Sequence, residues 1–239
     1  MKKISLLFLL FGLQLGISQE RTLVPDSLLL GRYSLKMSGE DFQLQPEAAT
    51  AFESMRVAAL KDSIVLKVVS SFRDYATQKR IWNRKYKRFT AEGMPPEAAI
   101  EKIIEYSTLP GTSRHHWGTD IDLVLGDIEV EGDLLLEEHF HQGGPYEKLR
   151  LWMEKNASTF GFILVYTNDE ERKGFHYEPW HYSYAPLSIS YLERYSENYL
   201  LQKMTKDTTL LGHEHLNKEF LNQYFKENIL DVNPLLKML

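Results

Sequence analysis

The 239-residue chain contains no cysteine. This absence excludes disulfide bonds and a lipid-modified cysteine, and it leaves histidine and carboxylate side chains as the ligands for any zinc ion. The chain also lacks a His-Glu-x-x-His motif, which excludes the helical site of the common zinc proteases. Its net charge is −5, so nucleic acid is not an expected partner.

Long apolar runs are scarce as well. Met1-Lys2-Lys3 is followed by a mostly apolar stretch from Ile4 to Ile17, which is too short to favour a membrane span. A short basic start before such a stretch is typical of a secretory signal peptide, which we expect to cover residues 1–18. The expected location is therefore across the inner membrane, in the periplasm or outside the cell.

The remaining composition is that of an ordinary globular protein, with 43% hydrophobic and 26% charged residues. Its length suits one domain with a real core plus an appendage. We expect an N-terminal arm over residues 19–44, a main domain over 45–185 and a helical C-terminal extension over 186–239. The arm shows no clear period and is expected to be a poorly ordered lead-in. The extension either packs on the domain or contacts a partner, and the oligomeric state is left open.

Hydrophobic periodicity and start signals predict the elements of these parts. Helices are expected over residues 46–60, from the N-cap Asp74 to about 89, over 97–106 and 145–158, and in the extension over about 188–204 and 214–228. Strands are expected over 63–70, from Thr119 onward and over 161–166, with strand and loop over 175–184.

Two distant stretches combine the side chains that catalytic zinc sites use. The first holds His115 and Asp122 seven positions apart, and the second holds His181 with Glu178 three positions before it. Two imidazoles and one carboxylate can hold a zinc ion and leave one position for water. A second carboxylate beside that water can accept its proton.

The spacing within each stretch constrains the backbone. Seven residues span roughly 23 Å in a strand and about 10 Å in a helix, so the chain must turn to bring His115 and Asp122 to one ion. Gly118 is the natural place for that turn. In the second stretch, Pro179 lies between Glu178 and His181 and argues against a helix there.

The same residues carry a resemblance to a known family. Ser113-x-His115-x-x-Gly118-x-x-x-Asp122 resembles the Ser-x-His-x-x-Gly-x-Ala-x-Asp signature of VanY-type D-alanyl-D-alanine carboxypeptidases, a group related to lysostaphin and the hedgehog signalling domain. The segment Glu178-Pro179-Trp180-His181-Tyr182 is similar to their second signature. Residues 70–78 and 161–164 resemble two flanking family segments. The resemblance covers about residues 45–185.

The resemblance implies a fold and an activity. The implied fold is a small α+β domain in which a central antiparallel sheet is flanked by helices. The implied activity is a secreted zinc metallopeptidase that trims the C-terminal D-alanine from peptidoglycan stem peptides. The alternatives are a D,D-dipeptidase or an L,D-carboxypeptidase on the same scaffold, or a non-catalytic protein that binds peptidoglycan.

The resemblance also implies residue roles. His115, Asp122 and His181 are the expected Zn²⁺ ligands, and zinc-bound water is the expected nucleophile, with Glu178 as its general base. The resemblance further implies substrate contacts. Arg73 is expected to hold the terminal carboxylate, because a guanidinium forks onto a carboxylate. Gln78 and Ser113 are weaker candidates for contact with the substrate.

Several residues depart from the family pattern or leave alternatives open. Asp120 stands where the family has alanine, and it either accepts a hydrogen bond from a ligand histidine or competes as a ligand. Val165 and Ser183 replace arginines that relatives often carry. His116 adjoins His115, but adjacent side chains point apart, so it is not expected to bind the same ion. His176 either contacts the substrate or the base, or serves packing.

The helix expected after Asp74 is rich in basic residues. A solvated helix face is the favoured explanation, and attraction of an acidic cell-wall polymer is the alternative. The residues concerned are Lys79, Arg80, Arg84, Lys85, Lys87 and Arg88.

Overall fold

The computed structural model describes residues 25–33, 36–195 and 207–237, so the expected signal peptide lies outside the described residues. In the described part, four strands form one antiparallel sheet in the order β1-β2-β4-β3. The strands are β1 (Leu66–Ser70), β2 (Asp120–Leu125), β3 (Phe162–Leu164) and β4 (His181–Tyr184). The predicted α+β class with a small central antiparallel sheet is confirmed.

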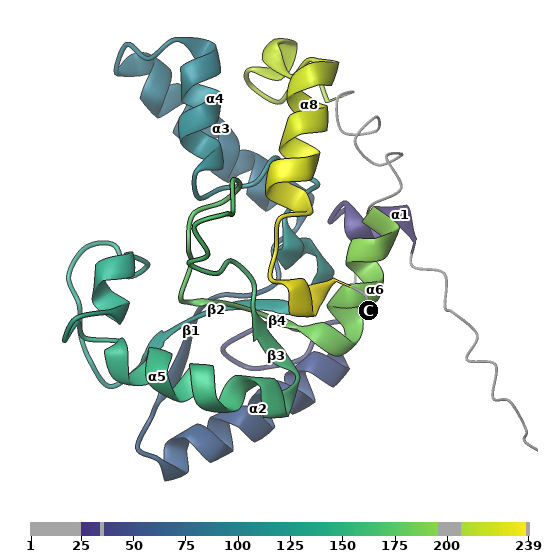
Figure 1. The fold of residues 1–239 in the computed structure, drawn as a ribbon. Coiled ribbons are helices and arrows are strands. Elements are labelled where there is room, and N and C mark those ends of the chain that lie inside the picture. The colour runs from purple at the N-terminus through teal and green to yellow at the C-terminus, as the bar shows by residue number, and fades with distance from the viewer. Residues whose placement is uncertain (1–24, 34–35, 196–206, 238–239) are drawn as a thin grey trace, which may run out of the picture.

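Helices pack on both sides of this sheet (Figure 1). The α-helices are α1 (Asp26–Leu29), α2 (Pro46–Lys61), α3 (Tyr75–Ala91), α4 (Pro96–Ile104), α5 (Glu147–Asn156), α6 (Ala185–Tyr195) and α8 (Lys218–Tyr224). Short 3-10 helices are η1 (Arg114–Trp117), η2 (Glu137–Phe140), η3 (Ala157–Phe160), η4 (His213–His215) and η6 (Pro234–Leu236), and η5 (Phe225–Ile229) is a π-helical turn that continues α8.

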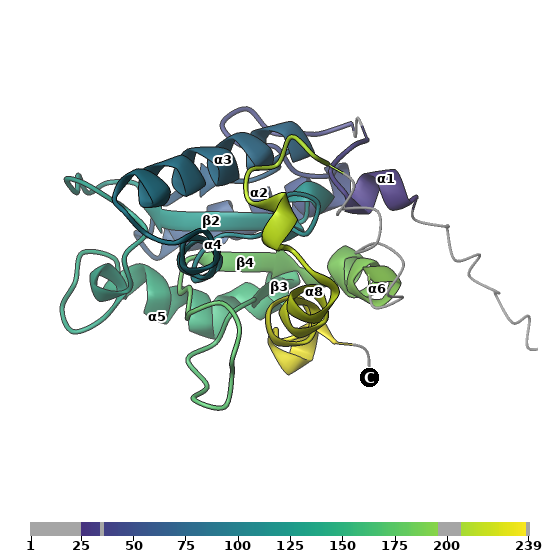
Figure 2. The ribbon, with the colours of Figure 1, turned by 90° about the horizontal axis from the view of Figure 1, so that it is seen from above.

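The start of α3 follows from local sequence. Asp74 is its N-cap, as predicted, and the carboxylate accepts a hydrogen bond of 2.7 Å from the backbone N–H of Thr77. The cap fixes the point at which the chain leaves β1 and enters the helix. Seen from above, α3 runs roughly along the direction of β2 (Figure 2).

Two apolar clusters divide the core. One cluster lies between the sheet and the pair α2 and α5, and includes Phe52, Ile121 and Trp152. The other lies on the opposite side, among α3, α4, α6 and α8, and includes Trp82 and Ile100. The sheet is therefore covered on both faces, which explains why every residue of β2 is buried.

The expectation of a poorly ordered lead-in is wrong for residues 25–33 and 36–44. Leu28, Leu29 and Leu30 are buried in the same apolar cluster as Trp117. Transfer of three leucine side chains out of water is favourable, and this free energy holds the arm against the domain. Gly31 adopts φ 67° directly against the ring of His116, where a Cβ would lie 2.5 Å from the imidazole. This arm therefore supports the loop that carries the first signature.

The C-terminal extension also packs on the domain. Tyr191 of α6 and Tyr224 of α8 join the cluster around Trp82 and Trp117. The predicted helix over about 188–204 corresponds to α6, which is described as far as Tyr195, and residues 196–204 lie outside the described part. The predicted helix over 214–228 begins at Lys218, because Asn217 is its N-cap and accepts from the N–H of Phe220. None of the described helices has the length and apolar character that a membrane crossing requires.

Gly174→Ala is expected to destabilise the protein by about 1–3 kcal/mol, the usual cost of overpacking a tight contact. A Cβ at Gly174 would overlap the backbone carbonyl oxygen of Glu227. Because both groups belong to the backbone or are fixed to it, no change of side-chain rotamer can relieve the overlap. Chemical denaturation measures the free energy of unfolding. Lys173→Ala is the matched control, since Lys173 is exposed and its backbone bond to Asp231 is kept. Equal stability of the two variants would show that this loop does not hold the extension.

Candidate metal centre and active site

The sheet register places three polar side chains in one row. In the antiparallel pairing of β1, β2 and β4, Ser70 lies opposite Asp122, and Asp122 lies opposite His181. Directly opposed residues on antiparallel strands have Cβ atoms about 4.5–5.5 Å apart, so their side chains meet. The pairing between strands distant in sequence thus joins the two signatures.

His115 comes to the same place from η1. Gly118 ends η1 in the left-handed region with φ 65°, and this turn, predicted from the spacing, leads directly into β2. The backbone carbonyl of His115 accepts from the N–H of Arg73, which ties η1 to the end of β1. His115 is therefore held above the strand that carries Asp122.

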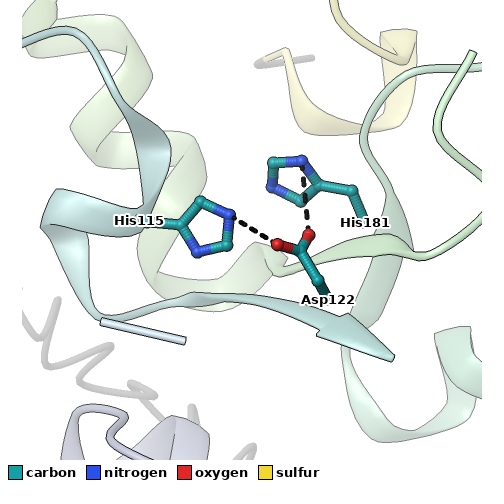
Figure 3. A group of neighbouring side chains, drawn as sticks. All are labelled: His115, Asp122 and His181. Carbon is teal, nitrogen blue, oxygen red and sulfur yellow. Dashed lines mark ion pairs between the residues drawn. The ribbon is translucent and has the colours of Figure 1, made fainter. Parts of the chain in front are cut away.

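The three side chains point toward one another (Figure 3). His115 Nε2 lies 3.3 Å from Asp122 Oδ2, and His181 Nδ1 lies 3.9 Å from Asp122 Oδ1. One ligand atom from each residue fits within a mutual separation of 4.8 Å, and all three residues are buried. Two ligands at about 2.0–2.1 Å from one tetrahedral ion lie about 3.3–3.4 Å apart, so the trio nearly matches a zinc site.

Two of the donor atoms also have a lone pair available for a metal ion. Asp122 Oδ1 is buried and has no hydrogen-bond partner among the described residues, which is costly for a carboxylate oxygen unless a cation binds it. His115 Nδ1 lies 2.8 Å from the carbonyl oxygen of Ser71, so this nitrogen carries the hydrogen and Nε2 presents its lone pair to the trio. The residues present therefore fit a metal ion.

Asp120 contacts the other imidazole of the trio, that of His181. Its fully buried carboxylate lies 3.0 Å from His181 Nε2 and accepts from the guanidinium of Arg114 at 2.9 Å. The hydroxyl of Ser183 donates a further hydrogen bond of 2.6 Å to the Asp120 carboxylate. Burial opposes ionisation, yet Arg114 and His181 keep the pKa of Asp120 well below its usual range. Asp120 therefore fixes the hydrogen on Nε2 and leaves Nδ1 to face the trio.

Arg114 is a residue of this network that the sequence interpretation missed. Its side chain is 4% exposed, it bonds Asp120 and Ser183, and its guanidinium lies 4.5 Å over the ring of Trp117. A signal was present, because an extra acidic residue inside a buried strand needs a buried base nearby. Ser183, which stands in place of an arginine, accepts the hydrogen bond from Arg114.

Asp120→Asn is expected to weaken zinc binding by about 10–100-fold, the usual effect of removing the carboxylate that orients a ligand histidine. Competition with a chromophoric chelator measures the affinity. Ser183→Ala is the control, since it removes another partner of Asp120 and keeps the bond to His181. A fall in melting temperature with unchanged zinc affinity would assign Asp120 to stability alone.

Glu178 lies beside the trio, at the position where a general base is expected. Its Oε2 is 2.8 Å from His181 Nδ1, and the residue is 7% exposed. Burial alone would lower the pKa of His181, but the hydrogen bonds to Asp120 and Glu178 outweigh it and raise the pKa to about 10. Nδ1 therefore carries a proton in the absence of metal, and a metal ion must displace that proton to bind.

A cleft of about 650 Å³ opens above these residues. His115, Asp122, Glu178 and His181 line it together with two of the expected substrate contacts, Arg73 and Ser113. The cleft thus brings the proposed base, the metal ligands and the candidate contacts to a single surface that a peptide can reach.

Gln78 occupies a different place from the expected substrate contact. It is fully buried and is not among the residues that line the cleft. Its Oε1 accepts a hydrogen bond of 2.7 Å from Arg73, and its Nε2 donates to the carbonyl of Thr108. Ser70 accepts a second bond of 2.8 Å from Arg73. Gln78 thus orients Arg73 rather than touching a ligand.

His116 and His176 lie outside the trio. The fully buried ring of His116 lies 2.5 Å from the carbonyl oxygen of Arg73 and accepts from the N–H of Gly111 at 3.0 Å. Burial lowers its pKa to about 3, so the ring is neutral and structural. The ring of His116 is engaged by the backbone of Arg73 and Gly111 and does not belong to the trio. His176 is exposed and stacks on Tyr106 at 4.8 Å, which favours the packing alternative.

Comparison with known proteins agrees with this geometry. The family model for D-alanyl-D-alanine carboxypeptidase, VanY, matches residues 41–187. VanXYC of Enterococcus gallinarum, a bifunctional D-Ala-D-Ala dipeptidase and D-Ala-D-Ala carboxypeptidase, is 32% identical over 168 residues, which cover 70% of this chain and 77% of the relative.

Two solved structures share the fold. VanYB in complex with D-alanine-D-alanine is similar with a TM-score of 0.54 at 22% identity, covering 74% of this chain and 92% of the other. A mutant of the D,D-pentapeptidase VanY in complex with Zn(II) gives a TM-score of 0.53 at 23% identity, covering 72% and 90%. Since the family model spans well over half of the sequence, the chain belongs to the VanY family of D-alanyl-D-alanine carboxypeptidases.

Proposed function

We propose that this chain is a zinc-dependent carboxypeptidase that removes the C-terminal D-alanine from peptidoglycan stem peptides. One observation carries the proposal: a buried carboxylate, Glu178, lies 2.8 Å from a ligand nitrogen of the His115, Asp122 and His181 trio, inside an open cleft. A base beside an ion site is the arrangement that metal-assisted peptide hydrolysis needs. The zinc complex of a VanY relative supports the choice of metal.

The residues divide the chemistry between them. Zn²⁺, when bound, supplies Lewis acidity and lowers the pKa of water toward neutrality. Glu178 takes a proton from the attacking water and returns it to the leaving nitrogen as the carbon–nitrogen bond breaks. Asp120 holds the ring of His181 in one orientation throughout, so the ligand set needs no rearrangement.

Arg73 would select the end of the peptide. Its two terminal nitrogens are anchored by Gln78 and Ser70, so its guanidinium has a fixed direction in the cleft. Burial lowers the pKa of Arg73, and the carboxylates of Asp122 and Glu178 oppose that shift. A preoriented cation close to the trio suits a terminal carboxylate, which favours removal of one residue over cleavage within a chain.

D,D-dipeptidase activity is the second candidate, because the relative VanXYC combines both activities. L,D-carboxypeptidase activity on the same scaffold and a non-catalytic peptidoglycan-binding role are the remaining alternatives. A pure binding protein has no need of a general base, so Glu178 speaks against the last.

Incubation of the zinc-loaded protein with a pentapeptide stem, a tetrapeptide stem and free D-Ala-D-Ala tests these alternatives by mass spectrometry. We expect loss of one alanine from the pentapeptide. Cleavage confined to free D-Ala-D-Ala would indicate a dipeptidase, and cleavage confined to the tetrapeptide would indicate an L,D-enzyme. No product from any of the three would overturn the proposal.

We also propose that the chain is exported, on the basis of the apolar stretch after Lys2 and Lys3. Expression of the full chain in a bacterial host, followed by mass measurement of the exported protein, tests this. A product shortened by about 18 residues is expected, and a full-length product retained in the cytoplasm would contradict it.

A further inference from the structure

The basic residues of α3 fall into two groups in the structure. Lys79 pairs with Asp207 at 3.0 Å, and Arg80 bonds Thr77, so these two have partners on the surface. A second group lines the same cleft as the metal-binding trio, and consists of Arg84, Lys85 and Arg88. Arg84 and Arg88 are exposed, as the solvated-face explanation expects, whereas Lys85 is half-buried at the wall of the cleft.

These three cations have little compensating charge. Over the part of the chain that the structure describes, Arg84 and Lys85 form no ion pair, and Arg88 approaches Glu92 only at 3.9 Å with both side chains exposed. Burial lowers the pKa of Lys85, the neighbouring Arg88 lowers it further, and Glu178 opposes the shift. A partly desolvated ammonium among like charges is costly unless an anion arrives to pair with it.

We propose that Arg84, Lys85 and Arg88 form a subsite for a second carboxylate of the peptide, carried on the acyl side of the scissile bond. The inference rests on the proposed carboxypeptidase function and names its substrate class. The matching stem peptides have diaminopimelate with a free side-chain carboxylate before the two terminal alanines, whereas peptides with lysine at that place lack the anion.

The dimensions allow this assignment. Arg84 and Arg88 lie one helical turn apart, about 6 Å along α3, so both can reach one carboxylate with Lys85 beside them. Arg73, near the start of α3, remains available for the terminal carboxylate. A side-chain carboxylate two residues before the scissile bond lies up to about 13 Å from it in an extended peptide, so it can bind at a place in the cleft separate from that of the terminal carboxylate.

The other charges of the cleft support the same ligand. Asp133, from the loop before η2, and Glu137, the first residue of η2, also line the cleft. The end of a diaminopimelate side chain carries an ammonium as well as a carboxylate. A cleft lined by both acidic and basic side chains is complementary to such a zwitterion, while a lysine side chain would leave the basic residues unpaired.

Three matched pentapeptides test the subsite: one with free diaminopimelate, one amidated at its side-chain carboxylate and one with lysine. Wild-type protein is expected to show at least a tenfold higher kcat/KM for the free acid. Lys85→Met should reduce this preference to about twofold by lowering kcat/KM on the free acid more than on the other two peptides. Arg88→Gln provides a second variant with the same expected direction.

Lys87→Met is the matched control, because Lys87 is exposed on the same helix and does not line the cleft. Equal kcat/KM for the three peptides, or an equal loss on all three in Lys85→Met, would overturn the subsite. So would variants that lose binding to an anionic wall polymer while peptide preference stays unchanged.

Calorimetric binding of the same peptides separates this inference from the proposed function. If no peptide is cleaved, the carboxypeptidase proposal fails, and selective binding of the free acid by wild-type protein but not by Lys85→Met still supports the subsite. Equal binding of the free and amidated peptides rejects the subsite even when cleavage is observed.

Discussion

Glu178→Ala is expected to lower kcat by about 10²–10⁴-fold on a D-Ala-D-Ala peptide, which is the usual contribution of a positioned general base. The carboxylate lies 2.8 Å from His181 Nδ1, close enough to meet a water at the trio. Zinc content should stay near one ion per chain, because the three ligand residues are intact. Steady-state kinetics and elemental analysis of the same sample measure both effects.

The control for this experiment is Glu138→Gln, which removes an exposed carboxylate that does not line the cleft. It should retain kcat within a few fold, so a general loss of negative charge can be separated from loss of the base. Near-normal turnover by Glu178→Ala would remove Glu178 from its role. A parallel loss of zinc would instead make it a ligand.

His181→Ala is expected to abolish zinc binding and with it all detectable peptidase activity. Its imidazole is one of the three proposed ligand groups, and a site left with His115 and Asp122 alone keeps too few donors for a stable zinc ion. The variant also leaves the buried Asp120 without one of its charge partners, so some loss of stability should accompany the loss of metal. Zinc content after dialysis is the direct measurement.

His213→Ala is the histidine control, since His213 is partly exposed in η4, pairs with Glu214 at 3.2 Å and does not belong to the trio. It should bind one zinc ion as wild-type protein does. Because His181→Ala can unfold, circular dichroism of the metal-free forms should be compared first. A folded His181→Ala protein with full zinc content would refute the ligand assignment.

Two of the departures from the family pattern are connected. Asp120 on β2 and Ser183 on β4 form one hydrogen-bonded group with Arg114 of η1 behind His181. Judged singly from the sequence, Asp120 was a rival ligand as much as a supporting residue. The structure favours the supporting role, since Asp120 contacts the nitrogen of His181 that points away from Asp122.

Features that depend on local geometry were predictable. The turn at Gly118, the N-cap at Asp74 and the strand after Thr119 all follow from residue type and neighbours, because such preferences act over a few residues. The ligand types also followed, since a chain without cysteine has only imidazoles and carboxylates to offer a zinc ion.

Features that depend on contacts between residues distant in the sequence were not predictable from the sequence. The packing of Leu28 to Leu30 under the first signature required knowledge of which cluster receives them. The inward direction of Gln78 depends on how α3 rests against the loop at Thr108. The division of the basic residues of α3 between solvent and cleft depends on which face of the helix the cleft meets.

The amino-acid sequence by itself determined the family, the set of metal-binding and basic side chains, and the local turns that present them. Only the tertiary structure decided that Asp122, and not Asp120, faces both His115 and His181 Nδ1. The physical reason is that the strand period places both aspartates on one face, while the pairing of β2 with β4, between residues about sixty positions apart, selects which of them meets each nitrogen.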